Sequence, residues 1–277
     1  MTNMILGIIV IVIICISVFN IEEINPPKVS KEKSNLFKDM AGIFKNKYYV
    51  MIILFVIFYF LGYLALAASI QYYFTYIIGS TSAMQISLSL MTIIPMPVML
   101  FAAYLNGKGI AKSRLTIFGG IINIFGILLL FFADSVIVAE IGIIIYAVGN
   151  GFRNTMMFAM FPDVFDYTEY QMGKTLAGTQ TAVIGFGSKL ASAGASAIVS
   201  ALLTWGAYNS EVLDAIIHAG GSVSDIATSY PRTVLAIRLA FAGLSLITVI
   251  ASILIMIPYD LDKKYQEIRK ELDARKM

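Results

Sequence analysis

The sequence is poor in the residues that build metal centres and disulfides. Its 277 residues include one cysteine, Cys15, and one histidine, His218. A single cysteine excludes a disulfide within these residues, and His218 has no second histidine or thiol with which to share a zinc ion. We therefore expect no metal site and no cofactor bound by the chain alone.

Charge is also scarce. Only 13% of the residues are charged, whereas 58% are hydrophobic, and the mean hydropathy is +0.82. These values lie far from those of a soluble domain and indicate an integral membrane protein, with the lipid bilayer as its main partner. The net charge of +3 is small, and we expect no nucleic-acid partner.

Seven apolar stretches are candidates for membrane crossing. A helix needs about 20 residues to cross a hydrocarbon core of about 30 Å, and no stretch alternates with the period of two that marks a barrel strand. The first stretch lacks the basic start and the cleavage site of a signal peptide, so we interpret it as a membrane helix. The predicted helices cover residues 4–19, 48–76, 82–104, 115–133, 136–160, 176–207 and 233–258.

The distribution of lysine and arginine predicts the orientation, because these residues accumulate on the cytoplasmic side. They are frequent in 28–47, in 106–114 and after Tyr259, and absent from the 208–231 loop. We therefore expect a protein of the cell membrane with an external amino terminus and a cytoplasmic carboxyl terminus.

The same patterns divide the chain into four parts. A first helix (1–19) precedes a predicted cytoplasmic loop (20–47), a six-helix bundle (48–258) and a cytoplasmic tail (259–277). Apolar residues at helical spacing predict an amphipathic surface helix in the loop. These residues are Leu36, Phe37, Met40, Ile43 and Phe44.

An acidic motif, FPDVFDYTEYQMGK (161–174), follows the fifth predicted helix and is interpreted as a cytoplasmic loop. Its Asp163, Asp166 and Glu169 recur every third residue. Such carboxylates bind Mg²⁺ in some membrane enzymes, but the chain has no second acidic motif. They also fit an inner gate closed by ion pairs, or a merely solvated loop. The basic partners expected for a gate are Lys108, Lys112 and Arg114.

Lys189 lies deep inside a predicted membrane helix. An ammonium at this depth costs several kcal/mol unless it faces a partner or a wet cavity, and both helix ends are too far away for its side chain to reach water. Serine, glycine and alanine recur beside it and permit close helix packing. The sequence therefore predicts that Lys189 borders a cavity.

A second polar group occurs in the preceding predicted helix, where Asn150, Arg153 and Asn154 fall within one turn. They are plausible donors to sugar hydroxyls, although Arg153 is equally suited to pair with the acidic motif. Tyr59 and Tyr63, four residues apart, are suited to stacking on a sugar ring or to bundle packing.

Two structural expectations concern polar and proline residues elsewhere. Arg238 and Glu140 both fall near the predicted outer side and are candidates for an ion pair. Pro95 and Pro97 predict a kink in the third helix.

Four segments together resemble a known family. They are YYFTYIIG (72–79), the acidic motif, Lys189, and the tail YDLDKKYQEIRKELDARK (259–276). These segments resemble the glycoside-pentoside-hexuronide:cation symporters, the melibiose-permease-like branch of the major facilitator superfamily. The sequence differs from the family pattern at 173–178, where an arginine and a glutamate that the pattern contains are absent. It implies an all-α integral membrane fold, the carboxyl-terminal six-helix bundle plus one preceding helix of a twelve-helix transporter.

The resemblance also implies a function. The chain would be part of a secondary transporter for a small sugar or glycoside, driven by Na⁺, H⁺ or Li⁺, and not an enzyme. Its partner would be a missing amino-terminal half, whose acidic residues Lys189 would face. The alternatives are a carrier of lysolipid or another amphiphile with the same fold, and a non-transporting membrane subunit or truncated remnant.

Overall fold

The computed structural model describes residues 2–20 and 36–276, and every regular element in these two ranges is a helix. The chain forms two units, Met1–Ser34 and Asn35–Met277. The described part of the first unit is helix α1 (Thr2–Asn20), so the predicted first stretch is helical. The elements described below all belong to the second unit.

Six helices in the described residues are long and apolar enough to cross a membrane, and α1 is not among them. Their positions agree with the last six predicted stretches. They are α3 with the π-helical turn η1 (Lys47–Ile78), α4 with α5 (Thr81–Gly107), α6 (Lys112–Phe132), α7 (Val136–Met172), α8 (Ala177–Trp205), and α11 with η2 and α12 (Pro231–Met256).

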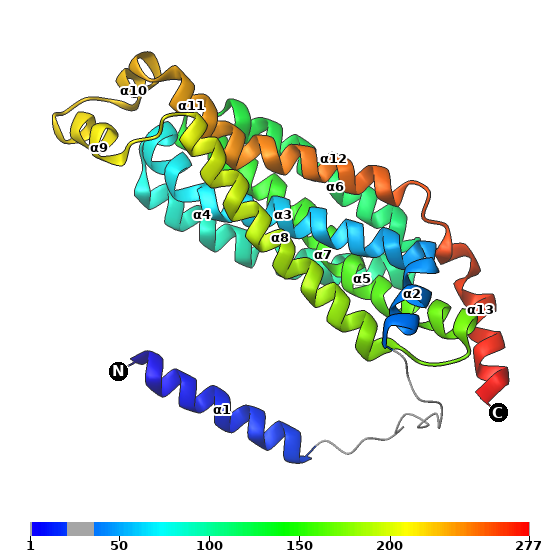
Figure 1. Ribbon diagram of the computed structural model, residues 1–277. Helices are drawn as coiled ribbons and strands as arrows, with labels where there is room; N and C mark the ends of the chain where they lie inside the picture. The colour runs from blue at the N-terminus through cyan, green and yellow to red at the C-terminus, as the bar shows by residue number, and fades with distance from the viewer. Residues whose placement is uncertain (1, 21–35, 277) are drawn as a thin grey trace. The chain divides into compact units, whose positions relative to one another are not determined.

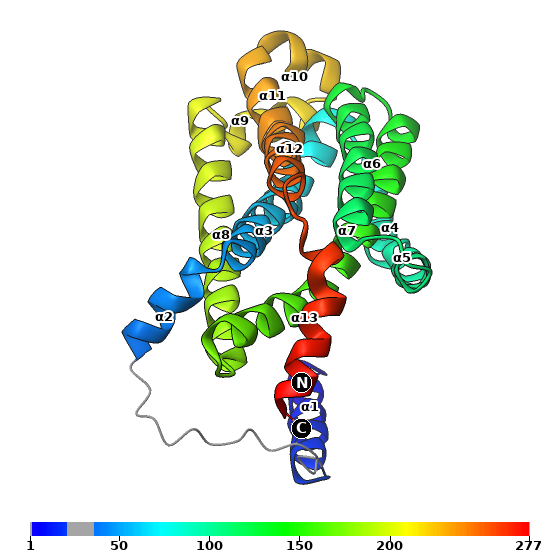
Figure 2. The same cartoon turned by 90° about the vertical axis from the view of Figure 1, so that its right-hand side faces the viewer.

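Helix α3 (Lys47–Tyr73) lies between α8 and α12 (Leu244–Met256), while α7 lies against α6 and against α4 (Thr81–Ile93) and α5 (Pro95–Gly107). Figure 1 shows these helices running along one another. Figure 2 looks along the bundle and shows α8 and the α4–α5 pair on opposite sides of it.

Glycines allow α6 and α7 to approach closely. A Cβ atom on Gly149 would lie 2.5 Å from the Gly119 carbonyl oxygen, and one on Gly126 would lie 2.6 Å from the Tyr146 nitrogen. These distances are far below van der Waals contact, so the two backbones touch where side chains are absent. By contrast, a Cβ on Gly185 of α8 would meet no atom within 4 Å. Glycines thus bring the backbones of α6 and α7 into direct contact.

The third predicted helix, which corresponds to α4 and α5, is interrupted as predicted. Helix α4 ends at Ile93 and α5 begins at Pro95. Proline lacks the N–H that would continue the hydrogen-bond ladder and clashes with the preceding turn. A different irregularity occurs in α3 and in the last crossing helix, where η1 (Phe74–Ile78) and η2 (Leu239–Gly243) form π-helical turns.

The prediction of a loop at 161–174 was wrong. Helix α7 continues through Pro162 to Met172, and Gly173 ends it with a φ of +69°. The proline and the run of polar residues predicted a break, but this part of α7 packs against other elements that hold it helical. Asp163, Asp166 and Glu169 thus lie on a helix.

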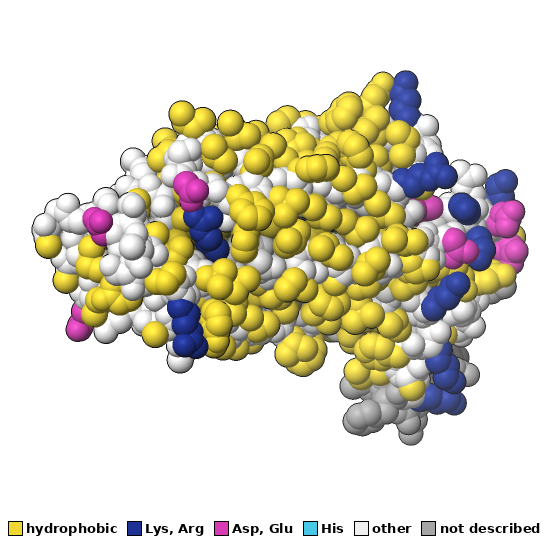
Figure 3. All heavy atoms as spheres, turned by 90° about the horizontal axis from the view of Figure 1, so that it is seen from above, with side chains coloured by type: hydrophobic (Ala, Val, Ile, Leu, Met, Phe, Trp, Pro, Cys, Tyr) yellow, Lys and Arg dark blue, Asp and Glu magenta, His cyan; other side chains and the backbone are white. Residues whose placement is uncertain are grey.

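Short helices cover both ends of the bundle. The predicted external loop contains α9 (Ser210–His218) and α10 (Val223–Ser229), and α11 (Pro231–Arg238) follows. At the other end lie α2 (Leu36–Lys45), in which Ile43 is buried, and the tail helix α13 (Leu261–Lys276). Figure 3 shows a broad apolar surface with Lys and Arg side chains gathered mainly at the α13 end.

Candidate functional site

The acidic motif and the start of α6 are joined by an ion pair. Lys112 Nζ lies 2.5 Å from Asp163 Oδ2 and also donates to the Ala159 carbonyl at 2.9 Å. Asp163 is buried, with 4% of its surface exposed. The structure therefore brings one of the three predicted basic residues to one of the three predicted acidic ones.

A second pair involves the tail, which sequence reasoning did not connect to the motif. Asp166 Oδ2 accepts hydrogen bonds from Arg269 Nη1 and from the Tyr265 hydroxyl, each at 2.7 Å. Arg269 and Tyr265 belong to α13, about a hundred residues farther along the chain. A contact between residues so far apart in the sequence cannot be predicted from a local sequence pattern.

Lys108 and Arg114 form no ion pair with any residue in the described ranges. Lys108 lies over the ring of Tyr104, with its Nζ 5.2 Å from the centroid. Arg114 lines a pocket that also includes Lys263 of α13. Glu169 is part of the same helical stretch, and its backbone carbonyl accepts from the N–H of Gly173.

The beginning of α13 ties α3 and α6 together. Asp262 Oδ2 accepts from the Ser113 N–H at 2.9 Å and from its hydroxyl at 2.7 Å. Asp260 accepts from Lys264 at 2.7 Å and from the Tyr48 hydroxyl at 2.6 Å. The hydrogen bond from Lys264, and to a smaller extent that from Tyr48, lowers the pKa of Asp260 well below its usual range. In turn, the hydrogen bond to Asp260 raises the pKa of Lys264.

A buried polar network links α3, α7 and α8 near the same end. Thr168 Oγ1 lies 2.8 Å from both Asn46 Nδ2 and Gln180 Nε2, while the Tyr49 hydroxyl donates to the Gln180 carbonyl at 2.8 Å. Lys174 forms an ion pair with Asp39 of α2. These bonds join α2, α3, α7 and α8 at the end of the bundle to which α13 is also bound. A polar cluster flanking apolar spans is the signal that would have pointed to this network.

Lys189 occupies an exposed position on α8. It lies twelve residues after Ala177, the first residue of the helix, which is roughly 18 Å along the axis at 1.5 Å per residue. Its ammonium makes no hydrogen bond or ion pair with any residue in the described ranges. The large apolar neighbours Phe186 and Leu190 are exposed as well.

Arg153 lies inside the bundle rather than at the acidic motif. Its Nη1 donates to Asn123 Oδ1 of α6 at 3.0 Å and its Nη2 donates to the Ser252 hydroxyl of α12 at 2.7 Å. The guanidinium carbon also lies 5.1 Å from the ring centroid of Tyr59. Only 2% of Arg153 is exposed. Arg153 thus links four helices, and Asn123, a polar residue in an apolar span, is a partner that sequence reasoning missed.

The remaining candidates lie around this guanidinium. Tyr59 and Tyr63 stack on each other, with ring planes 2° apart and centroids 6.3 Å apart. Asn150 is buried, and its Oδ1 has no hydrogen-bond partner among the described residues. Asn154 and Tyr63 are half-buried. In this group, Asn154 and Tyr63 are partly accessible, whereas the polar side chains of Asn150 and Arg153 are buried.

The predicted pairing of Arg238 with Glu140 was wrong. Arg238 forms an ion pair with Asp134 and also donates to the Phe131 carbonyl. Glu140 Oε2 accepts from the Ser87 hydroxyl at 3.1 Å. Asp134 lies in the short turn between α6 and α7, which brings it to the guanidinium.

These ion pairs and hydrogen bonds join α6, α7, α8 and α13 at one end of the bundle. In the described residues, no three His, Cys, Asp or Glu side chains lie together in a way that would hold a metal ion. Asp163 and Asp166 instead have separate cationic partners.

A family model described as "MFS/sugar transport protein" matches residues 1–263. A search of curated proteins found no significant match. The all-helical architecture, with its membrane-spanning helices, agrees with the family match. The chain is therefore a multi-pass membrane protein that belongs to the MFS/sugar transport protein family of the major facilitator superfamily.

Proposed function

We propose that this chain forms one six-helix bundle of a sugar or glycoside:cation symporter that works by alternating access. Transporters of this kind rock two bundles about a site near the bilayer midplane. The family match supports sugar transport. We further propose that the chain belongs to the melibiose-permease-like branch, that a second bundle completes it, and that α13 lies on the cytoplasmic side.

The observation that carries the proposal is the exposed ammonium of Lys189. It lies near the middle of α8, a helix that is apolar enough to cross a membrane. A lysine facing lipid at that depth would cost several kcal/mol. A second bundle or a water-filled path on this side of α8 would remove the cost. We propose that acidic groups of that second bundle face Lys189 and bind the coupling cation.

The sugar would be bound by the polar group on α3 and α7. Asn154 and Tyr63 are accessible enough to contact it, the first through its amide and the second through its ring. Tyr59 supports Tyr63 by stacking, and Arg153 supports Tyr59 from behind. The unpartnered Asn150 Oδ1 is a further acceptor for a sugar hydroxyl.

The ion pairs at the α13 end would form the inner gate. Asp163 with Lys112, and Asp166 with Arg269, hold α6, α7 and α13 together. In an alternating-access cycle such pairs break when this end opens and form again when it closes.

An amphiphile such as a lysolipid is the second candidate substrate. It is favoured by the apolar surroundings of Lys189, since Phe186 is 70% exposed beside it. A cationic group flanked by apolar side chains suits a phosphate head attached to an acyl chain. Fold alone does not choose between these substrates.

Uptake measurements separate the candidates. The chain would be expressed in cells lacking related carriers, alone and together with the amino-terminal five-helix bundle of a sugar symporter of the same family. Uptake of a galactoside, a pentoside, a hexuronide and lysophosphatidylcholine would be followed under Na⁺, Li⁺ or H⁺ gradients.

We expect gradient-driven uptake of a sugar, and only in the combined case. Uptake of lysophosphatidylcholine without any sugar would replace the proposed substrate with the amphiphile. Robust sugar uptake by the chain alone would contradict the need for a different second bundle. Expression of a folded pair without uptake of any substrate would favour a non-transporting subunit.

A further inference from the structure

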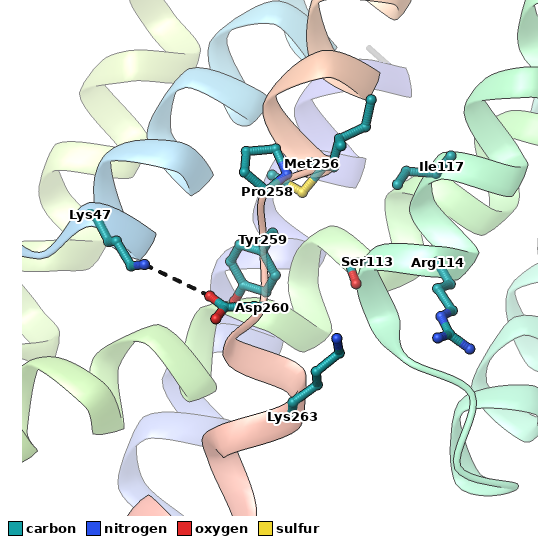
Figure 4. A pocket seen from close by; sticks show the side chains of 10 residues that line it. Lys47, Ser113, Arg114, Ile117, Met256, Pro258, Tyr259, Asp260 and Lys263 are labelled. Carbon is teal, nitrogen blue, oxygen red and sulfur yellow. Dashed lines mark ion pairs between the residues drawn. The ribbon is translucent and has the colours of Figure 1, made fainter.

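A pocket of about 370 Å³ opens at the end of the bundle that carries α13 (Figure 4). It lies where α3 and α6 begin and where α12 passes into the tail. Its size falls within the range of about 300–1,000 Å³ typical of small-ligand sites. The lining residues are Lys47, Ser113, Arg114, Ile117, Met256, Ile257, Pro258, Tyr259, Asp260 and Lys263.

The pocket carries an excess of positive charge. Three lining residues, Lys47, Arg114 and Lys263, are cationic, and only Asp260 is anionic. Asp260 is already bound by Lys264 at 2.7 Å, whereas Lys47 lies 3.8 Å from it. Arg114 and Lys263 form no ion pair with any residue of the described part of the chain. Figure 4 shows these two side chains extending from α6 and from α13.

The position of the pocket along the helices places it at a membrane boundary. The crossing segment that ends with α12 stops at Met256, and those of α3 and α6 begin at Lys47 and Lys112. The pocket residues thus occur at the ends of three apolar spans. Headgroups of a bilayer lie at this level.

Exposed apolar side chains lead from the pocket toward the interior of the spans. They recur at intervals of three or four residues on α12 and on α6, so each set forms one stripe along its helix. Helices α6 and α12 are neighbours in the bundle. Such stripes are suited to acyl chains. The exposed residues are Ile250 and Leu254 on α12, Ile257 directly after it, and Phe118, Ile121 and Phe125 on α6.

We infer that this pocket binds the headgroup phosphate of an anionic phospholipid, whose acyl chains lie along α6 and α12. Arg114 and Lys263 supply charge-assisted hydrogen bonds to the phosphate oxygens, and Lys47 adds to the positive field. Basic pockets between membrane helices are suited to such headgroups. A free phosphate shares the headgroup chemistry but lacks the apolar contacts, and therefore binds more weakly. The pocket is distinct from the polar group proposed for the sugar on α3 and α7, and it lies at the same end of the bundle as the proposed gate.

The test uses the purified full chain in detergent and fluorescent phosphatidylglycerol, with phosphatidylcholine as the neutral lipid. We expect the double variant Arg114→Gln/Lys263→Gln to bind phosphatidylglycerol about thirtyfold more weakly, since each of the two basic groups near an anionic lipid contributes about 1 kcal/mol and about 1.4 kcal/mol corresponds to a factor of ten. Arg114→Lys retains the charge and should retain most of the binding. The matched control is Lys108→Gln/Lys270→Gln, which removes the same charge from two residues that do not line the pocket.

Three outcomes would overturn the assignment. Equal loss of binding in the control pair would mean that overall charge, not this pocket, attracts the lipid. Displacement of phosphatidylglycerol by inorganic phosphate or glycerol 1-phosphate at comparable concentration would identify a site for soluble anions. Unchanged binding by a folded Arg114→Gln/Lys263→Gln variant would remove the pocket from lipid recognition altogether.

Discussion

Lys112 and Asp163 form an ion pair that fastens the start of α6 to the distal part of α7, with 2.5 Å between Nζ and Oδ2. Asp163 is buried, so the carboxylate depends on this partner for its charge to be stable. Removing one member of a buried pair leaves the other charge uncompensated. Replacing both by apolar residues is tolerated far better.

Lys112→Ala is therefore expected to destabilise the protein by about 3–5 kcal/mol. The double variant Lys112→Met/Asp163→Leu should recover most of this loss. The measurement is thermal unfolding in detergent followed by intrinsic fluorescence. Lys108→Ala is the matched control, because Lys108 has no acidic partner among the described residues and its ammonium lies over the ring of Tyr104. Equal melting temperatures for Lys112→Ala and the parent would contradict the structural role of the pair.

The glycine contact between α6 and α7 gives a second prediction. Gly149→Ala places a Cβ 2.5 Å from the Gly119 carbonyl oxygen, so the helices must separate. We expect a loss of about 1–3 kcal/mol, typical of overpacking, in the same unfolding measurement. Gly185→Ala on α8 is the control, since no atom lies within 4 Å of the new methyl group. A control as destabilised as Gly149→Ala would show that helix propensity or lipid contact, not α6–α7 packing, governs both positions.

The docking of α13 should depend on pH through Asp260. Hydrogen bonds from Lys264 and Tyr48 lower the folded-state pKa of Asp260 below its unfolded value of about 3.9. Its contribution is therefore present above about pH 4 and is lost as the pH falls through the lower folded-state pKa. A spin label at Glu267, introduced as cysteine after Cys15→Ala, should become more mobile below about pH 4.

In Asp260→Asn the same label should be more mobile at neutral pH and should respond less to acid. This comparison separates Asp260 from the other carboxylates that α13 contacts. Unchanged label mobility in the parent chain as the pH falls from 7 through the lowered folded-state pKa of Asp260 would rule out an acid-sensitive contact.

The proposed topology predicts which positions are reached from outside. Gln171 near the end of α7 would be cytoplasmic, and Ala215 in α9 would be external; both side chains are exposed. Single cysteines at these positions, in a Cys15→Ala background, would be treated with a membrane-impermeant thiol reagent in intact cells. We expect labelling at position 215 only. Labelling at 171 and not at 215 would invert the orientation.

The apolar spans were predictable because membrane crossing imposes length and hydrophobicity on each segment. The predicted 115–133, for example, corresponds to Lys112–Phe132 in the structure. The extent of α7 was not predictable in this way. Pro162 and its polar neighbours indicate a break, and the helix persists through contacts with Asn46, Lys112 and Arg269, which are remote in sequence.

The candidate site was predictable in part for the same reason. Polar residues in apolar spans, such as Arg153 and Lys189, are visible because their burial in lipid is costly. Their partners are set by how helices pack, so neither Asn123 nor Ser252 was paired with Arg153 beforehand. The Lys112–Asp163 pair was among the predicted combinations, whereas the role of Tyr265 and Arg269 depends on where α13 folds back.

The proposed function gives the exposed ammonium of Lys189 a part in cation-coupled transport. Its most direct test is gradient-driven sugar accumulation by Lys189→Ala, measured in the combined two-bundle system with Lys270→Ala on α13 as the matched control. We expect Lys189→Ala to abolish accumulation while the protein remains folded in the membrane, and Lys270→Ala to accumulate sugar normally. Near-normal accumulation by Lys189→Ala would contradict the account and leave Lys189 without a part in the mechanism.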